Sequence, residues 1–518
     1  MPILKSESYK KGIAYSTLLN VVSKGLVFVN SLVVAFYFGT QIKTDIYFYT
    51  YNTIVILSAF ITSLNASVLI PESMRIRVKE GEEKAKGFLN LFIYGYIALT
   101  VIIVIVFLTA PTDIFKVMSS FELQSIQDQK TILLLAVPLI VMMPLVNLLT
   151  DTMASYKYFT MPMIAGIING FFSIAFVIIF HGVLDITSLL CGLLVSYSIN
   201  LFLLIFLMAK KLSWNFRIVR INIEKRIWKN IGFAQAGNIT SSLCTYAPLY
   251  LLSGFSAGII TSLNFAQQIS SLPTHLITNQ FSVVTGIKFN EQYARGDYTG
   301  LNRTFVATSG FLLFILFPVS GIMFLFPVEI ASLLLERGAF GEKGVAETAL
   351  FLKYLGFLAP LLAINTLFSR LFMAAHKIAE SFWYQVALNI ILIILLYLLI
   401  KHLGVIGYPL AMISIYLLNV FFIYFLQKHY FNIIDYKNII ILFLKILGLN
   451  LMVLFGVYSL IKWQDGFSSI FKVFFGSTLY IGLIVFIGTK LSISSAFNSF
   501  VQQYIGKYFM FIQKGKQQ

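Results

Sequence analysis

Residues 88–110 read FLNLFIYGYIALTVIIVIVFLTA, a run without a single charged side chain. The hydrocarbon core of a bilayer is crossed by a helix of about 20 apolar residues, so this stretch predicts a membrane-spanning helix. It is not an isolated run, because 58% of the chain is hydrophobic and 11% is charged, against about 25% charged residues in soluble domains. The composition therefore predicts an all-α polytopic membrane protein.

The same criterion, applied along the whole chain, predicts about fourteen membrane helices. The second, seventh and eighth are rich in Ser, Thr, Asn and Gln. The predicted spans are 12–37, 45–70, 88–110, 131–154, 159–181, 187–209, 230–254, 260–287, 303–327, 345–372, 380–401, 405–427, 438–461 and 470–489.

Lysine and arginine fall unevenly between the loops that join these spans. If the N-terminus is cytoplasmic, the cytoplasmic segments contain about three times as many Lys and Arg as the outer ones, which is the distribution that sets orientation in membranes. The N-terminal apolar run reaches about residue 39, which is too long for a signal peptide and predicts a retained first helix. We therefore expect a multi-pass protein of the cell (inner or plasma) membrane with both termini cytoplasmic.

A net charge of +17 is compatible with nucleic-acid binding, but the basic residues lie in short loops and form no single basic face. No nucleic-acid partner is expected. Cys191 and Cys244 are distant and lie in apolar runs, where packing is the expected role.

Two stretches suggest an internal repeat. SVLIPESMRIRVKEGE (67–82) and SVVTGIKFNEQYARGD (282–297) each leave a polar-rich helix and enter a charged loop, with six helices between them. Transporters are commonly built from such repeats around a binding site. We predict an N-terminal lobe (1–211, helices 1–6), a cytoplasmic basic linker (212–229), a C-terminal lobe (230–428, helices 7–12), two further helices (429–490) and a cytoplasmic basic tail (491–518).

Polar residues concentrate in the first, second, seventh and eighth spans. The first carries Asn20, Lys24 and Asn30, and Asn20 and Lys24 share one helical face. An ammonium at mid-bilayer depth costs roughly 2.5 to 3.5 kcal/mol on insertion scales and is kept mainly where it meets a wet cavity or a partner. Single Ser, Thr and Asn residues often only join helices. Their density here predicts a central hydrophilic cavity.

Motifs for catalysis are absent from the sequence. There is no HExxH, GxSxG or Walker A motif, and the longest predicted outer loops, 111–130 and 328–344, are short. A polytopic glycan polymerase or ligase is expected to have a long external loop. The chain is therefore predicted not to be an enzyme.

Four stretches together resemble the MurJ/MviN lipid II flippase family of the multidrug/oligosaccharidyl-lipid/polysaccharide (MOP) flippase superfamily. IASLLLERGAF (330–340) ends in an ERGAF-like motif, and ETALFLKYLGFLAPLLAINTLFSRLFMAAHK (347–377) contains a YxxG step and an SRxFxA end. FGTQIKTDIYFY (38–49) is similar to FGxxxxTDxFF, and SLNFAQQISSLP (262–273) is similar to ALxYAxRLxxLP.

This resemblance implies a fourteen-helix transporter that moves a polyprenyl-diphosphate-linked glycan from the cytoplasmic to the outer leaflet by alternating access. It also implies that helices 13 and 14 form a groove for the lipid tail. A diphosphate needs compensation inside the membrane, and Lys24 is the expected cation. No cofactor is expected, and a coupling ion or the membrane potential is left open. Enzymes of glycan synthesis are possible partners.

The cavity departs from the family pattern. Lys24 stands where the family usually has an arginine, Asn30, Ser58 and Gln268 stand where it tends to have further arginines, and Ser63 stands where an acidic residue is common. Lysine and arginine differ as phosphate ligands. The cargo is therefore predicted to be lipid II or a related lipid-linked oligosaccharide for another surface glycan.

The predicted site has two parts. The expected substrate-binding residues are Lys24, Asn20, Asn30, Asn52, Ser58, Asn238, Asn264, Gln267 and Gln268. The expected gate residues, assigned from position, are Asp45, Glu336, Arg337 and Arg370. Two other functions stay open at this point: an ion-coupled efflux transporter of the drug-exporting (MATE-like) branch, and a non-transporting scaffold for glycan synthesis.

Overall fold

The structure is a computed structural model that describes residues 9–217, 224–375, 377–461 and 469–491. Within these ranges every regular element is a helix, which confirms the predicted all-α class. The predicted tail lies outside the described residues from 492 onward, as do residues 218–223 of the predicted linker.

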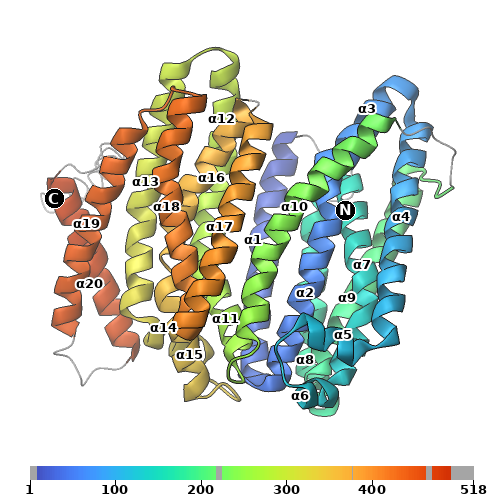
Figure 1. Cartoon of the computed structure of the whole chain (residues 1–518), viewed down its shortest axis with the longest axis horizontal. Coiled ribbons are helices and arrows are strands. Elements are labelled where there is room, and N and C mark those ends of the chain that lie inside the picture. The colour runs from blue at the N-terminus through green and yellow to red at the C-terminus, as the bar shows by residue number, and fades with distance from the viewer. Residues whose placement is uncertain (1–8, 218–223, 376, 462–468, 492–518) are drawn as a thin grey trace, which may run out of the picture. The chain divides into compact units, whose positions relative to one another are not determined.

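The chain forms two compact units (Figure 1). Unit 1 is Met1–Thr261 with Arg337–Gly344, and unit 2 is Ser262–Glu336 with Val345–Gln518. The helices of unit 1 are α1 (Tyr9–Phe38), α2 (Ile42–Leu64), α3 (Ile70–Glu80), α4 (Glu82–Thr109), α5 (Pro111–Met118), α6 (Leu123–Asp128), α7 (Lys130–Ser155), α8 (Met161–Leu184), α9 (Thr187–Leu212) and α10 (Lys225–Leu252).

Helix α11 (Ile259–Pro273) begins in unit 1 and continues into unit 2. The other helices of unit 2 are α12 (Asn279–Ala294), α13 (Tyr298–Leu325), α14 (Pro327–Leu335), α15 (Glu342–Leu355, whose first residues belong to unit 1), α16 (Leu358–Ala374), α17 (Ile378–Leu403), α18 (Gly407–Tyr430), α19 (Tyr436–Ile461) and α20 (Ser469–Lys490).

Each predicted span coincides with one of these helices or with a broken helix. By length and hydropathy, ten helices of the described chain are suited to cross a membrane, or eleven if the bent pair α15–α16 is one span. The range Glu380–Tyr430 is one of these ten, although it contains two helices, α17 and α18, separated by the 3₁₀ turn Gly404–Ile406. Helices α10 and α11–α12 do not pass, because their polar residues lower the hydropathy. The predicted count of fourteen is therefore not confirmed.

Two helices are interrupted by a π-helical turn. Asn65–Leu69 follows α2, and Thr274–Thr278 follows α11. A proline lies beside each turn, Pro71 in the first turn of α3 and Pro273 at the end of α11. Proline lacks an N–H group and its ring crowds the carbonyl four residues earlier, which favours widening or kinking of the helix.

Unit 1 has its own hydrophobic core. Buried side chains of α2, α3, α4, α7 and α9 meet there, among them Ile76, Phe88 and Leu148. Ile227 of α10 belongs to the same core, and α10 packs along α2. Packing therefore groups the seventh predicted span with the first six. The predicted lobes were defined by repetition along the chain, so they stay predictions.

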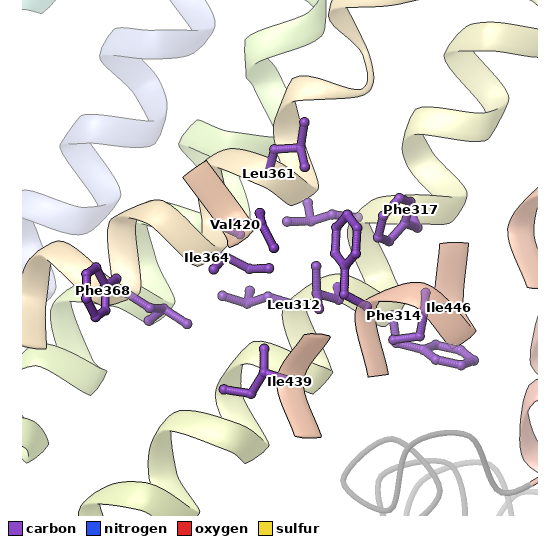
Figure 2. Packing of buried hydrophobic residues seen from close by; sticks show 14 of the residues in the cluster. Leu312, Phe314, Phe317, Leu361, Ile364, Phe368, Val420, Ile439 and Ile446 are labelled. Atoms are coloured by element: carbon purple, nitrogen blue, oxygen red, sulfur yellow. The ribbon is translucent and has the colours of Figure 1, made fainter. Parts of the chain in front are cut away.

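Unit 2 has a second core, formed by α12, α13, α16, α18, α19 and α20 (Figure 2). Leu312 and Phe314 of α13, Ile364 of α16 and Ile439 of α19 are almost completely buried there. The two predicted C-terminal helices correspond to α19 and α20, which pack on each other and on α13. Their proposed role as a lipid groove stays a prediction.

Candidate functional site

Lys24 lies on α1, on a different face from the one that packs against α8. The packing face carries Ser23 and Leu26, which lie so close to Gly166 and Gly170 of α8 that a methyl group on either glycine would overlap them. Lys24 is exposed, and its ammonium makes no hydrogen bond or ion pair with any described residue. Because its charge is uncompensated within the described chain, Lys24 is available to bind an anion.

Of the other eight predicted substrate-binding residues, two have side chains without a hydrogen-bond partner among the described residues, and six have partners. Asn20 and Asn52 are half-buried and form no side-chain hydrogen bond with another described residue. The other six have hydrogen-bond partners: Asn30 Oδ1 accepts from Ser173 Oγ at 3.1 Å, Ser58 Oγ accepts from Asn147 at 3.4 Å, Asn238 donates to Ala234 O of its own helix, Gln268 donates to Asn264, and Gln267 donates to Tyr408.

Asn30 and Ser58 accordingly have structural contacts within unit 1. The Asn30 bond joins α1 to α8, and the Ser58 bond joins α2 to α7. Polar residues of α2 and α10 also meet, since Gln235 Nε2 donates to Phe60 O at 3.2 Å and the Ser63 hydroxyl donates to Gln235 Oε1 at 3.4 Å. Part of the polar density seen in the sequence therefore joins helices.

Asp45 is 1% exposed, and both oxygens of its carboxylate accept hydrogen bonds within unit 1. Its carboxylate accepts from Gly258 N at 2.7 Å, from Thr261 N at 2.7 Å and from Thr261 Oγ1 at 2.6 Å. Gly258 and Thr261 flank the N-terminus of α11, where free N–H groups and the helix dipole favour a negative charge. Asp45 thus fastens the start of α11 to the first turn of α2.

The ERGAF-like motif divides between the two units. Glu336 is exposed, directly follows α14 and accepts a hydrogen bond from the hydroxyl of Ser332 in that helix. Arg337 is exposed and begins the segment Arg337–Gly344, which packs in unit 1. There Ala339 N donates to Phe36 O at 2.7 Å, and Lys343 Nζ donates to Ala257 O at 3.0 Å. The segment Arg337–Gly344, called the strap below, therefore crosses the end of α1 and the turn at residues 257–258, which Asp45 also contacts.

Glycine is required where this strap meets α1. Gly39 and Gly338 have φ angles of +56° and +62°, in the left-handed region. A Cβ on Gly39 would overlap Ala339 O, and one on Gly338 would overlap Phe36 O. These two glycines let the two backbones approach closely.

Arg370 lies in unit 2 and is half-buried. Its aliphatic chain packs against Gly286 of α12, where an added Cβ would lie 3.2 Å from Arg370 Cδ. Arg370 lines a cavity of about 290 Å³ between α16 and α17. No hydrogen bond or ion pair joins it to another described residue.

The structure also shows a buried polar cluster that local sequence patterns did not predict. Asn65, at the π-turn after α2, donates to Asp151 Oδ2 at 2.8 Å and accepts from the Tyr96 hydroxyl at 2.8 Å. Tyr96 also donates to Ile61 O. The residues come from three separate helices, so only the tertiary fold brings them together.

A cluster of ion pairs joins the start of α10 to α3. Arg75 pairs with Glu72 and Glu224, and Arg226 pairs with Glu72. The Arg75 guanidinium, through its hydrogen bond and charge, lowers the pKa of the exposed Glu224 carboxyl. Arg75 and Arg226, which count toward the predicted orientation in the membrane, therefore also hold α10 in unit 1.

The model of the family described as lipid II flippase MurJ matches residues 34–478. The chain belongs to the lipid II flippase MurJ family. Members are transporters and not catalytic enzymes, so the prediction that the chain is not an enzyme is confirmed.

Individual relatives agree. The chain is 24% identical over 472 residues to a probable lipid II flippase MurJ of Borreliella burgdorferi, covering 88% of this chain and 91% of the relative. A solved lipid II flippase MurJ in an inward closed conformation matches with a TM-score of 0.78 at 20% identity, covering 92% of this chain and 98% of that one. An inward-facing MATE multidrug transporter of the MOP superfamily matches with a TM-score of 0.61 at 13% identity, covering 76% of this chain and 92% of that one. The structural matches show a shared fold.

Proposed function

We propose that the chain moves a polyprenyl-diphosphate-linked glycan, either lipid II or a related lipid-linked oligosaccharide, from the cytoplasmic to the outer leaflet of the cell membrane by alternating access. Family membership supports a lipid-linked cargo. The observation that carries the proposal is Lys24, an exposed cation in an apolar helix that has no partner among the described residues.

A diphosphate cannot enter hydrocarbon without compensation. A lysine on a helix face that is not used for packing supplies one charge-assisted contact. Asn20, one turn away on the same face, has a free amide for a second hydrogen bond. Asp45 and the ERGAF-like loop with Glu336 and Arg337 are proposed to contribute to the outer gate, because Asp45 and Lys343 both bind the turn at 257–258. Arg370 is proposed to steady the inner gate.

The test is depletion of the protein in its own cells, followed by identification of the lipid-linked intermediate that accumulates and of its leaflet. Accumulation of lipid II on the cytoplasmic face, with lysis, identifies a peptidoglycan flippase. A normal wall with loss of another surface glycan identifies a related cargo. Absence of any accumulated lipid-linked glycan contradicts the proposal.

Variants of Lys24 test the binding role. We expect Lys24→Ala to reduce transport about tenfold or more, the range for loss of one charge-assisted hydrogen bond. Lys24→Arg keeps the charge and should retain transport. Lys130→Ala is a matched control, because Lys130 is an exposed lysine at the start of α7. Full transport by Lys24→Ala at normal expression would show that the diphosphate binds elsewhere.

A further inference from the structure

The cavity beside Arg370 has the composition of an anion site. It lies within unit 2, between the C-terminal half of α16 and the first turns of α17. Seven of its ten lining residues have polar side chains, and none of the ten is Asp or Glu. The neutral ones include Ser369 and Ser381, whose hydroxyl groups have no hydrogen-bond partner among the described residues. The cavity therefore offers one fixed positive charge and several hydrogen-bond donors.

The nearest acid along α17 is already neutralised. Glu380, in the first turn of α17, pairs with Lys377 Nζ at 3.4 Å. Arg370 makes no hydrogen bond or ion pair with any described residue. Its guanidinium therefore has five N–H donors that no described residue accepts.

Asn365 adds a second donor to the cavity. Its Oδ1 accepts from Asn419 Nδ2 at 2.7 Å, which fixes the amide and leaves its NH₂ group as the donor. Arg370 and Asn365 both line the cavity, so an anion held there can accept hydrogen bonds from both side chains.

We propose that this cavity binds the phosphate of a lipid headgroup. Arginine binds phosphate oxygens through two parallel hydrogen bonds, and a cavity of about 290 Å³ suits a headgroup more than a whole ligand. Phe368, Phe372 and Met373 supply apolar walls, and Met373 is 57% exposed. Phe368 also belongs to the core of unit 2 (Figure 2), which holds this part of α16 in place.

The position of the cavity agrees with a lipid. It lies beside the turn between two membrane helices, where headgroups lie, on the side that the lysine and arginine distribution predicts to be cytoplasmic. The phosphate comes from a bilayer phospholipid or from the carried lipid itself. The second source rests on the proposed function, and the first does not.

The experiment uses the full-length protein in detergent, with lipid binding measured by native mass spectrometry. The probes are phosphatidylglycerol and undecaprenyl diphosphate, with diacylglycerol as the phosphate-free control. Three variants are compared with the unaltered chain: Arg370→Gln, Ser369→Ala and, as the matched control, Arg303→Gln. Arg303 lies on α13 in the same unit, is exposed and has no partner among the described residues.

We expect Arg370→Gln to weaken binding of at least one phosphate lipid about tenfold or more, with Arg303→Gln unchanged and diacylglycerol insensitive to both. Loss of phosphatidylglycerol binding identifies a phospholipid site, and loss of undecaprenyl diphosphate binding alone identifies a cargo site. Ser369→Ala should weaken binding of the same probe several-fold and keep the fold, because it removes an exposed hydroxyl that lines the cavity and has no hydrogen-bond partner among the described residues.

Equal binding of both lipids to Arg370→Gln and Arg303→Gln overturns the inference. If Arg370→Gln does not fold, the Ser369→Ala result decides, and unchanged binding of both lipids there overturns it. Arg370-dependent binding of phosphatidylglycerol in a protein that transports no glycan leaves the inference standing and refutes the proposed function.

Discussion

At the residue scale, two aspartates of unit 1 both accept hydrogen bonds but differ in how much of the side chain is exposed. Asp45 is 1% exposed and accepts from three donors at the start of α11. The Asp185 side chain is 58% exposed and pairs with Lys43 at 2.7 Å. Water screens an exposed pair, whereas a buried carboxylate that loses its charge leaves its donors without an adequate acceptor.

We therefore predict that Asp45→Asn destabilises the protein by about 2 to 3 kcal/mol, and that Asp185→Asn changes stability by less than about 1 kcal/mol. The asparagine at 45 presents an NH₂ group to backbone N–H donors. Thermal unfolding in one detergent, followed by circular dichroism, checks both variants. Equal melting temperatures for the two would show that the α11 contacts do not need the charge.

The pH dependence of Glu224 also belongs to this scale. Arg75 lowers the pKa of the Glu224 carboxyl. The ion pair between Arg75 and Glu224 therefore contributes its full stabilisation at a pH above the ordinary carboxyl pKa. This stabilisation is lost as the pH falls through the lowered pKa of Glu224. We expect the link between α3 and α10 to weaken in acid. Melting temperatures of Glu224→Gln and the unaltered chain should differ slightly at neutral pH and converge at acidic pH; a difference that grew on acidification would contradict this.

At the element scale, the strap Arg337–Gly344 shows how a short loop is held by backbone contacts. Gly39 and Gly338 adopt positive φ and leave no space for a side chain, while a Cβ added at Gly341 of the same strap would meet no atom within 4 Å among the described residues. A left-handed backbone costs a non-glycine residue about 1 to 2 kcal/mol before any overlap is counted.

We predict that Gly39→Ala and Gly338→Ala each cost at least about 2 kcal/mol, from strain and overlap together, and that Gly341→Ala is close to neutral. Limited proteolysis of the strap provides the measurement, since a strap that leaves α1 is cut faster. Cleavage at the same rate in Gly338→Ala and Gly341→Ala would show that this contact does not hold the strap.

At the scale of the whole molecule, each unit has a core of its own, and the chain passes between them more than once. Unit 1 takes in α10 and the strap, although residues 262–336 of unit 2 lie between them in sequence. The order of spans along the chain therefore does not give the packing units.

Orientation in the membrane is testable at this scale. With Cys191 and Cys244 replaced by serine, Glu122→Cys, between α5 and α6, should react with a membrane-impermeant maleimide in intact cells. Glu291→Cys, near the end of α12, should react only after permeabilisation. Both glutamates are exposed, so accessibility from the two sides is what differs. Reaction of both cysteines in intact cells would contradict the predicted topology.

The sequence by itself determined the helical class, the approximate spans and the family, because hydropathy and short motifs are local properties of the chain. It also located Lys24, since a charge inside an apolar run is visible without a fold. It did not determine the partners of Asn30 and Asp45, the grouping of α10 with unit 1, or the cavity beside Arg370. Those depend on which faces of distant helices meet, and helical periodicity specifies a face but not its neighbour. Tertiary packing decided them.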